Sequence, residues 1–309
     1  MSSADVIAAS EVFDLLTRII SAAVGLVIMI SMLILHNTFV LPFVTAGIIV
    51  IMLYELLRAV KLEKSIPILV ASFTYGITVP FVYSPRYNMI DSALTFAQYR
   101  ENRTIILFGI ALLCSMGIFV IWLNQHKKIR YEQIFFALAA MIFVPNAMST
   151  MVRIDRDNIQ HGVFFLVLGL CGAWIADSGA YFTGVAIGKH KLCPEISPKK
   201  TIEGFIGGII STAVVFVACF AVYNNIIANN PMKENAVSYI AVAVTGMLCA
   251  VIGTVGDLSA SMIKRQIGFK DYGKIMPGHG GLMDRFDSVL FVLPTFYCLI
   301  TIANNLNIL

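Results

Sequence analysis

Side chains suited to metal and phosphate chemistry gather directly after an apolar segment that ends at position 256. Asp257, Ser261 and Lys264 recur at helical spacing, so one face of a helix carries a carboxylate, a hydroxyl and an ammonium group. Carboxylates hold hard cations such as Mg²⁺ through oxygen, and lysine neutralises phosphate oxygens. This face therefore predicts part of a site for a nucleotide and its metal ion.

A second acidic cluster lies where the last apolar segment of the chain begins. Asp284, Asp287 and Ser288 stand at i, i+3 and i+4, so they also share one helical face. The further cations of the stretch are Arg265, Lys270 and Arg285. Carboxylates that face several cations form the arrangement that Mg²⁺-nucleotide chemistry requires.

The loop between these clusters has almost no side-chain bulk. It reads Pro277-Gly278-His279-Gly280-Gly281, with one imidazole among small residues. Such a loop can fold against a nucleotide or expose backbone N–H groups to phosphate. For His279 itself, a structural hydrogen bond is favoured over a role as general base.

An upstream constellation begins at Asp177, which ends a long apolar run. A carboxylate at membrane depth is costly, and this cost indicates a function. The segment SPKKT then adds two hydroxyls and two cations, on Ser197, Lys199, Lys200 and Thr201. The helix that follows would present free N–H groups to an anion, which suits a polyphosphate. The alternative is a basic loop beside a helix whose early glycines, at positions 204, 207 and 208, serve packing.

The elements that position these residues follow from composition. Of the 309 residues, 58% are hydrophobic and 13% are charged, against roughly a quarter charged in soluble domains. Long charge-free stretches match the roughly 20 residues of a membrane-spanning helix, and the longest divides at His36-Asn37. Backbone groups in lipid must be satisfied within each segment, so we predict an all-α polytopic bundle. The nine predicted spans are 16–35, 38–57, 66–83, 104–123, 133–152, 162–182, 204–223, 237–256 and 288–306.

Charge in the loops predicts the orientation of the bundle. The loops after the second, fourth, sixth and eighth spans hold 15 Lys and Arg residues, and the other loops between spans hold 6. By the positive-inside rule, the former face the cytoplasm together with the N-terminus. We expect a multi-pass protein of a bacterial-type inner membrane, with its site on the cytoplasmic side.

No linker or repeat divides the chain, so residues 1–309 are expected to form one membrane domain. Within it, residues 1–160 read as a scaffold of ordinary membrane helices, with Glu55 as an exception. Residues 161–309 carry nearly all of the chemistry and read as the catalytic half. The six scattered cysteines show no paired spacing and indicate packing rather than metal or disulfide chemistry.

The stretch from Ser261 to Asp287 resembles the signature of the phosphatidate cytidylyltransferases, also called CDP-diacylglycerol synthases. The matching positions are Ser261, Lys264, Arg265, Lys270, Asp271, Gly273, Pro277, His279, Gly280, Gly281, Asp284, Arg285 and Asp287. The upstream segment with DSGAYF, GKHKL and ISPKKTIEG is similar to the family as well. Together the two matches cover about residues 175–288, and the earlier spans match only in hydropathy.

The resemblance implies a phospholipid-biosynthesis enzyme that converts phosphatidate and CTP into CDP-diacylglycerol and diphosphate. The expected partners are CTP, phosphatidic acid, the lipid bilayer and Mg²⁺, with a second cation left open. A homodimer is suggested only by the resemblance, and nucleic acid is not expected.

On this reading, roles can be assigned to residues as hypotheses. The expected metal ligands are Asp257, Asp284 and Asp177. The residues expected to act in catalysis are Asp257, Lys264, Arg265, Asp284 and Asp287. The substrate-binding set is Asp177, Ser197, Lys199, Lys200, Thr201, Ser261, Lys270, His279, Gly280, Gly281 and Arg285.

Two other functions compete with this one. A transporter would also have many spans and an intramembrane carboxylate, but its site would lie near the midplane rather than at one face. A CTP-dependent kinase acting on polyprenol or phytol would share nucleotide and metal, and would release CDP instead of diphosphate.

Overall fold

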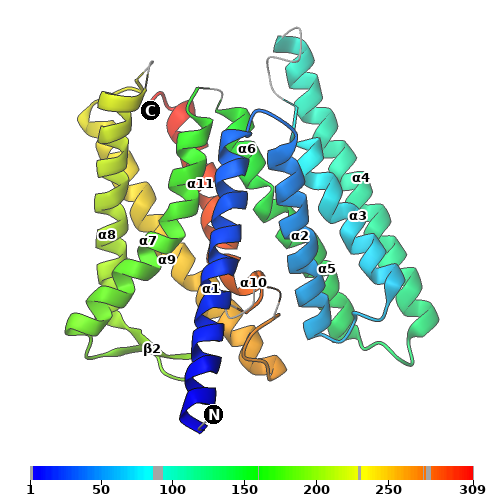
Figure 1. Cartoon of the computed structure of the whole chain (residues 1–309). Helices are drawn as coiled ribbons and strands as arrows, with labels where there is room; N and C mark the ends of the chain where they lie inside the picture. Colours follow the sequence, from blue (N-terminus) through cyan, green and yellow to red (C-terminus); the bar gives the residue numbers. More distant parts are fainter. Residues whose placement is uncertain are drawn as a thin grey trace.

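The structure, a computed structural model, describes residues 3–85, 93–158, 160–228, 231–273, 275 and 280–308. Among these residues it consists of long helices and one small hairpin (Figure 1). The first half holds α1 (Ser3–Ile34), α2 (Val40–Ala59), α3 (Ile66–Val82), α4 (Ala93–Gln125), α5 (Tyr131–Met148) and α6 (Thr150–Asp157). The second half holds α7 (Gly162–Ile187), β1 (Lys191–Cys193), β2 (Ser197–Thr201), α8 (Ile202–Val222), the π-helical turn η2 (Tyr223–Ile227), α9 (Ala236–Ile267), α10 (Met283–Phe286) and α11 (Val289–Asn305).

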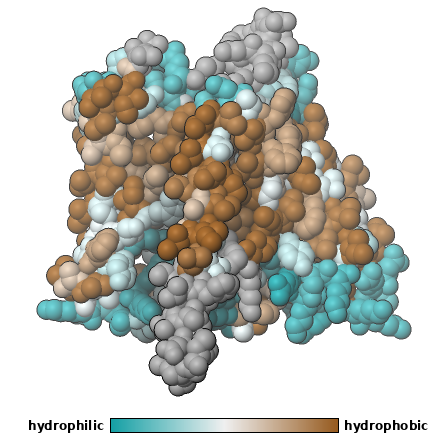
Figure 2. Space-filling model, viewed as in Figure 1, coloured by the Kyte–Doolittle hydropathy of each residue, from teal (hydrophilic) through white to brown (hydrophobic). Residues whose placement is uncertain are grey.

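The all-α membrane bundle expected from the sequence is confirmed. Within the described ranges, eight helices are long and apolar enough to cross a membrane. The remaining predicted span corresponds to α3, an apolar helix of 17 residues. Figure 2 shows the matching surface, with hydrophobic residues in a band at mid-height and hydrophilic residues gathered at both ends.

Two hydrophobic clusters hold the bundle together. One joins α2 and α5 to the helices of the second half, with Leu53, Phe165 and Phe296 among its buried side chains. The other lies among α2, α3, α4 and α5 and includes Ile68 and Met141. Because α2 contributes to both clusters, it connects the first half of the chain to the helices that carry the predicted chemistry.

The ends of the chain lie on opposite sides of the bundle. The N-terminus lies at the same end as the loops after α2, α4, α7 and α9, and the C-terminus lies at the other end (Figure 1). The four Lys/Arg-rich loops therefore share one face, which we call the basic face. The geometry of the bundle agrees with the alternation of charge along the sequence.

Three local features differ from the prediction. The predicted span 133–152 breaks at Ser149, where α5 ends and α6 begins. Helix α9 continues past the predicted end at 256 to Ile267, where Gly268 at φ 82° forms its left-handed cap. Among the described residues, the β1–β2 hairpin is a departure from the helical pattern and lies on the basic face.

The glycines at the start of α8 pack this helix closely against α7. A Cβ atom on Gly208 would lie 2.8 Å from the carbonyl oxygen of Ala176, and one on Gly207 would overlap the side chain of Thr183. At these two positions the packing interpretation holds, since the missing side chains make room for the neighbouring helix rather than for a ligand.

Candidate active site

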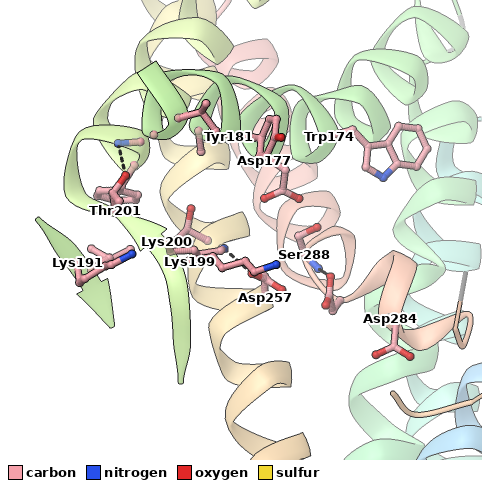
Figure 3. A pocket seen from close by; sticks show the side chains of 18 of the residues that line it. Trp174, Asp177, Tyr181, Lys191, Lys199, Lys200, Thr201, Asp257, Asp284 and Ser288 are labelled. Carbon is pink, nitrogen blue, oxygen red and sulfur yellow. Dashed lines mark hydrogen bonds and ion pairs between the residues drawn. The ribbon is translucent and has the colours of Figure 1, made fainter. Parts of the chain in front are cut away.

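A cavity of about 630 Å³ opens at the basic-face end of the second half of the chain. Its walls come from α7, the β1–β2 hairpin, the first turn of α8, α9, and the α10–α11 junction (Figure 3). Eight of the residues predicted from the sequence line it, namely Asp177, Lys199, Lys200, Thr201, Asp257, Asp284, Arg285 and Asp287. Residues 80 or more positions apart in the chain are therefore brought to one place by the packing of α7, α9 and α10.

Two ion pairs bring carboxylates and lysines together in this region. Lys200, on β2, reaches across to Asp257 on α9 and pairs with it (Figure 3). Lys264 lies on α9 about two turns beyond the predicted end of the apolar segment at position 256, and its ammonium is 2.8 Å from Asp284. Asp257 and Lys264 share one face of α9 but have different partners. Asp257 pairs with Lys200 of the hairpin, and Lys264 pairs with Asp284 of α10.

Asp284 is the most firmly held of these carboxylates. Its Oδ2 accepts hydrogen bonds from the backbone N–H groups of Tyr272, at 2.9 Å, and Gly281, at 3.1 Å, while Oδ1 takes the Lys264 ammonium. The side chain is only 6% exposed. Three donors therefore fix the carboxylate in orientation before any ligand is present.

Tyr272 connects this region to α9. Burial, followed by the negative charges of Asp284 and Asp287, raises the pKa of its hydroxyl well above the usual range. The hydroxyl therefore stays protonated, and it donates a hydrogen bond to the carbonyl oxygen of Ala260.

The junction of α10 and α11 places the second acidic cluster against the cavity. Asp287 and Ser288 are both buried and both line the cavity. Oδ1 of Asp287 accepts from the backbone N–H of Ser288 at 2.7 Å. Since Asp284 also lines the cavity, the face predicted from the i, i+3, i+4 spacing is present in the structure.

The hairpin supplies cations at the opposite side of the cavity. Antiparallel pairing sets Lys191 opposite Thr201, so Lys191 lines the cavity together with Lys199 and Lys200. Both Lys191 and Lys199 are exposed. At the base of the hairpin, Glu203 accepts from the imidazole of His190 at 2.6 Å.

Thr201 links the hairpin to the helix that follows. Its hydroxyl oxygen accepts from the backbone N–H of Gly204 at 3.1 Å and so caps the start of α8. Gly204 lines the cavity and also approaches α7, where a Cβ atom would lie 2.6 Å from the carbonyl oxygen of Ala180. One of the free N–H groups expected for an anion is therefore used by the cap.

Other predicted residues lie outside the lining of this cavity. They are Ser197, Ser261, Lys264, Arg265, Lys270, Gly280 and Gly281. Arg265 and Lys270 are exposed to solvent around the end of α9. Lys264 and the backbone N–H of Gly281 instead donate hydrogen bonds to Asp284. Pro277, Gly278 and His279 lie outside the described residues.

Several residues near the site were not predicted. Trp174, Tyr181, Lys191 and Thr254 line the cavity. Lys191 stands in the GKHKL segment, whose resemblance to the family could have drawn attention to it. Glu55 was noted as an acidic residue among apolar helices, and it contacts the α10 segment from the other half of the chain.

The donor chemistry of the cavity fits a hard divalent cation. Carboxylates from Asp177, Asp257, Asp284 and Asp287 line one cavity, and oxygen donors of this kind suit Mg²⁺. Within the described ranges, no three His, Cys, Asp or Glu side chains are already grouped as a metal site. Lys200 forms an ion pair with Asp257, and Lys264 forms one with Asp284. In this structure the charges of these two carboxylates are therefore neutralised by lysines.

Comparison with known proteins identifies the family. Residues 16–303 match the cytidylyltransferase family. A phosphatidate cytidylyltransferase of Bacillus subtilis is 34% identical over 251 residues, which is 81% of this chain and 84% of that protein. The chain belongs to the phosphatidate cytidylyltransferase family. Its relative in Haemophilus influenzae, of the same name, is 29% identical over 90% of this chain and 96% of that protein. Membership of this family confirms the prediction of a nucleotidyltransferase in a multi-pass membrane protein.

Proposed function

We propose that this enzyme transfers the cytidylyl group of CTP to phosphatidate, forming CDP-diacylglycerol and diphosphate. The observation that carries the proposal is one cavity, within a membrane bundle, that is lined both by carboxylates of α7, α9 and α10 and by lysines of the hairpin. The names of the relatives in Bacillus subtilis and Haemophilus influenzae support the same reaction. The volume of about 630 Å³ is in the range of sites for small molecules.

The chemistry is a displacement at phosphorus. A phosphate oxygen of phosphatidate forms a bond to the α-phosphorus of CTP. The bond from that phosphorus to the oxygen bridging the β-phosphorus breaks, and diphosphate leaves with the electron pair. Because the attacking phosphate is already ionised at neutral pH, the reaction needs no strong general base.

The lysines of the cavity suit the phosphate groups. Lys191 and Lys199 extend from the hairpin with exposed side chains, so they can contact phosphate oxygens without losing a buried partner. Lys200 is poised beside Asp257, and Lys264 beside Asp284. These two lysines would offset the charge of the reacting phosphates while keeping the carboxylates in place.

Asp177, Asp257 and Asp284 would hold Mg²⁺, and Asp287 would orient this group from the α10–α11 junction. Bound there, Mg²⁺ supplies positive charge that offsets the charge on the phosphates of CTP. A second cation remains a hypothesis. Chelation with EDTA is expected to abolish the transfer, and added Mg²⁺ to restore it.

The lipid substrate would enter sideways from the bilayer. Trp174 and Tyr181 line the cavity from α7 and are also exposed on the surface of the molecule, Tyr181 by 66%. Amphipathic aromatic side chains are typical of the membrane interface, where a phosphatidate headgroup lies. A route between the bilayer and the carboxylates along α7 is the path we propose.

The orientation in the membrane and the oligomeric state are part of the proposal. Because its loops are rich in Lys and Arg, we expect the basic face, and the cavity with it, to lie on the cytoplasmic side of a bacterial-type inner membrane. Labelling of Lys128→Cys by an impermeant thiol reagent only in inside-out vesicles would support this. A homodimer, suggested by the family alone, is tested by the mass of the protein in detergent.

The reaction is tested with purified protein in detergent, phosphatidate, Mg²⁺ and CTP labelled at the α-phosphorus. Label in the lipid and release of diphosphate are the expected results. Release of CDP with a polyprenol or phytol acceptor would replace the proposal by a kinase. Vesicle transport without dependence on CTP would replace it by a transporter.

A further inference from the structure

Glu55 belongs to α2, yet its carboxylate contacts the segment before α10. Its Oε1 accepts from the backbone N–H of Leu282 at 3.1 Å, and its Oε2 accepts from that of Met283 at 2.8 Å. The residue is 1% exposed. A carboxylate buried to this extent is costly unless its oxygens are satisfied, and here the α10 segment provides the donors.

The backbone around Glu55 is shaped to admit this carboxylate. A Cβ atom on Gly281 would lie 2.7 Å from both carboxylate oxygens, and one on Gly273 would overlap Oε1. Neither glycine needs a positive φ. Their small size is therefore explained by the space that the Glu55 side chain occupies.

The two stretches of backbone that contact Glu55, around residues 272–273 and 281–283, also hold Asp284. Its Oδ2 accepts from Tyr272, next to Gly273, and from Gly281, next to Leu282. Glu55 and Asp284 thus contact the same short stretches of backbone, and each contact of Glu55 is within one or two residues of a donor to Asp284. A shift of the Leu282–Met283 backbone would move the Asp284 carboxylate in the cavity.

We propose that Glu55 is a positioning residue, which fixes the backbone that orients Asp284 although α2 lies outside the cavity. The inference rests on the proposed function, since that function assigns Asp284 to the reaction. Glu55 does not line the cavity and so has no contact with substrate. Its effect reaches the reaction through Asp284, by way of the backbone that both carboxylates contact and the charge of Glu55 beside it.

The first test is the variant Glu55→Gln, which keeps the shape but puts an NH₂ group against one of the two backbone donors. Displacements near 1 Å can lower rates by about 100-fold, so we expect kcat to fall ~10- to 100-fold with KM for CTP changed by less than ~3-fold. Thr45→Val is the matched control. Thr45 is fully buried in the same helix and bonds only the carbonyl oxygen of Leu41, so its loss should lower stability without lowering kcat.

Hydrogen exchange gives a readout that does not depend on activity. In Glu55→Gln, amides of the 270–286 segment should exchange faster, while α7 and α11 keep the wild-type protection. Unchanged exchange and wild-type kcat would overturn the inference. Equal loss of protection throughout the bundle would also overturn it, because it would show a general structural role.

A second pair of variants covers the case in which Glu55→Gln does not fold. Gly273→Ala should lower kcat because the new methyl group meets Oε1 of Glu55. In a Glu55→Ala background the methyl group has room. Adding Gly273→Ala to that variant should therefore lower kcat by less than a further ~3-fold. Strictly additive losses would contradict the contact. If wild-type protein transfers no label to lipid, the proposed function fails, whereas the exchange data still test the Glu55 contact.

Discussion

The two sides of the cavity differ in how firmly they hold their charged groups. On the side of α10, Asp284 is 6% exposed and is held by two backbone N–H groups and Lys264. On the side of the hairpin, Lys191 and Lys199 are exposed. A fixed carboxylate suits a metal ion with strict geometry, and flexible lysines suit phosphates that move during reaction. The cavity thus has a preorganised side, where we propose that the metal binds, and an adaptable side, where we propose that the nucleotide binds.

The largest effect should come from the fixed side. Asp284→Asn removes the negative charge but keeps one acceptor oxygen, so the fold should survive while kcat falls by at least ~10³-fold. The measurement is transfer of α-phosphorus label to lipid. Glu132→Gln, at an exposed ion pair with Arg130, is the control and should keep wild-type activity. Full activity of Asp284→Asn would remove Asp284 from the proposed metal site.

The ion pair that joins the two sides should show coupling. Lys200→Ala leaves Asp257 without its partner, and Asp257→Asn leaves Lys200 without its own, so each should lower kcat/KM by about 100-fold. If the two act as a unit, the double variant should lose much less than the product of the single losses. Independent, multiplicative losses would show that the pair is incidental.

The adaptable side should give smaller effects that depend on salt. Lys191→Gln and Lys199→Gln each remove one exposed cation, and KM for CTP should rise ~3- to 10-fold with kcat nearly unchanged. The increase should shrink when wild type and variant are compared at high salt. Lys128→Gln, in the α4–α5 loop on the same face, is the matched control for net charge. A loss of kcat without a change of KM would contradict this prediction. It would show that these lysines are held as firmly for the reaction as Asp284 is.

The smallest effect should come from the junction of hairpin and helix. Thr201→Val removes the cap of α8 and should lower the free energy of unfolding by about 1 kcal/mol. Without the cap, the joint between β2 and α8 is held less rigidly, so the hairpin lysines are positioned less well for CTP. KM for CTP should therefore rise ~2-fold. Thermal unfolding in detergent and steady-state kinetics measure the two effects. A change in kcat without a change in stability would assign Thr201 a direct role at the phosphate instead.

The helices were predictable because a single local rule governs them. Lipid requires about 20 apolar residues in each span and internal satisfaction of the backbone. Helix ends in water escape this rule, which explains the extension of α9 to Ile267. The break at Ser149 lies among buried residues, so this rule does not account for it. The hairpin was not predicted, since Lys and Pro in SPKKT have low strand propensity and its pairing depends on Lys191 across the turn.

Spacing along the α10–α11 junction also predicted part of the site. Asp284, Asp287 and Ser288 do share a face, because helical periodicity is a local property. The partners of these faces were not predictable in the same way. Lys264 pairs with Asp284 and Lys200 pairs with Asp257, whereas the sequence left open which cation faces which carboxylate.

By itself, the sequence determined a bundle of membrane helices, an enrichment of positive charge on one face and the types of residue available for chemistry. These properties depend on composition and short-range periodicity. Both follow directly from the thickness of the bilayer and from the geometry of a helix. Only the tertiary structure decided that the hairpin lysines meet carboxylates of three helices in one cavity, and that Glu55 reaches Leu282, 227 positions later in the chain. Contacts of this range depend on how whole helices pack, and no local pattern of residues specifies that packing.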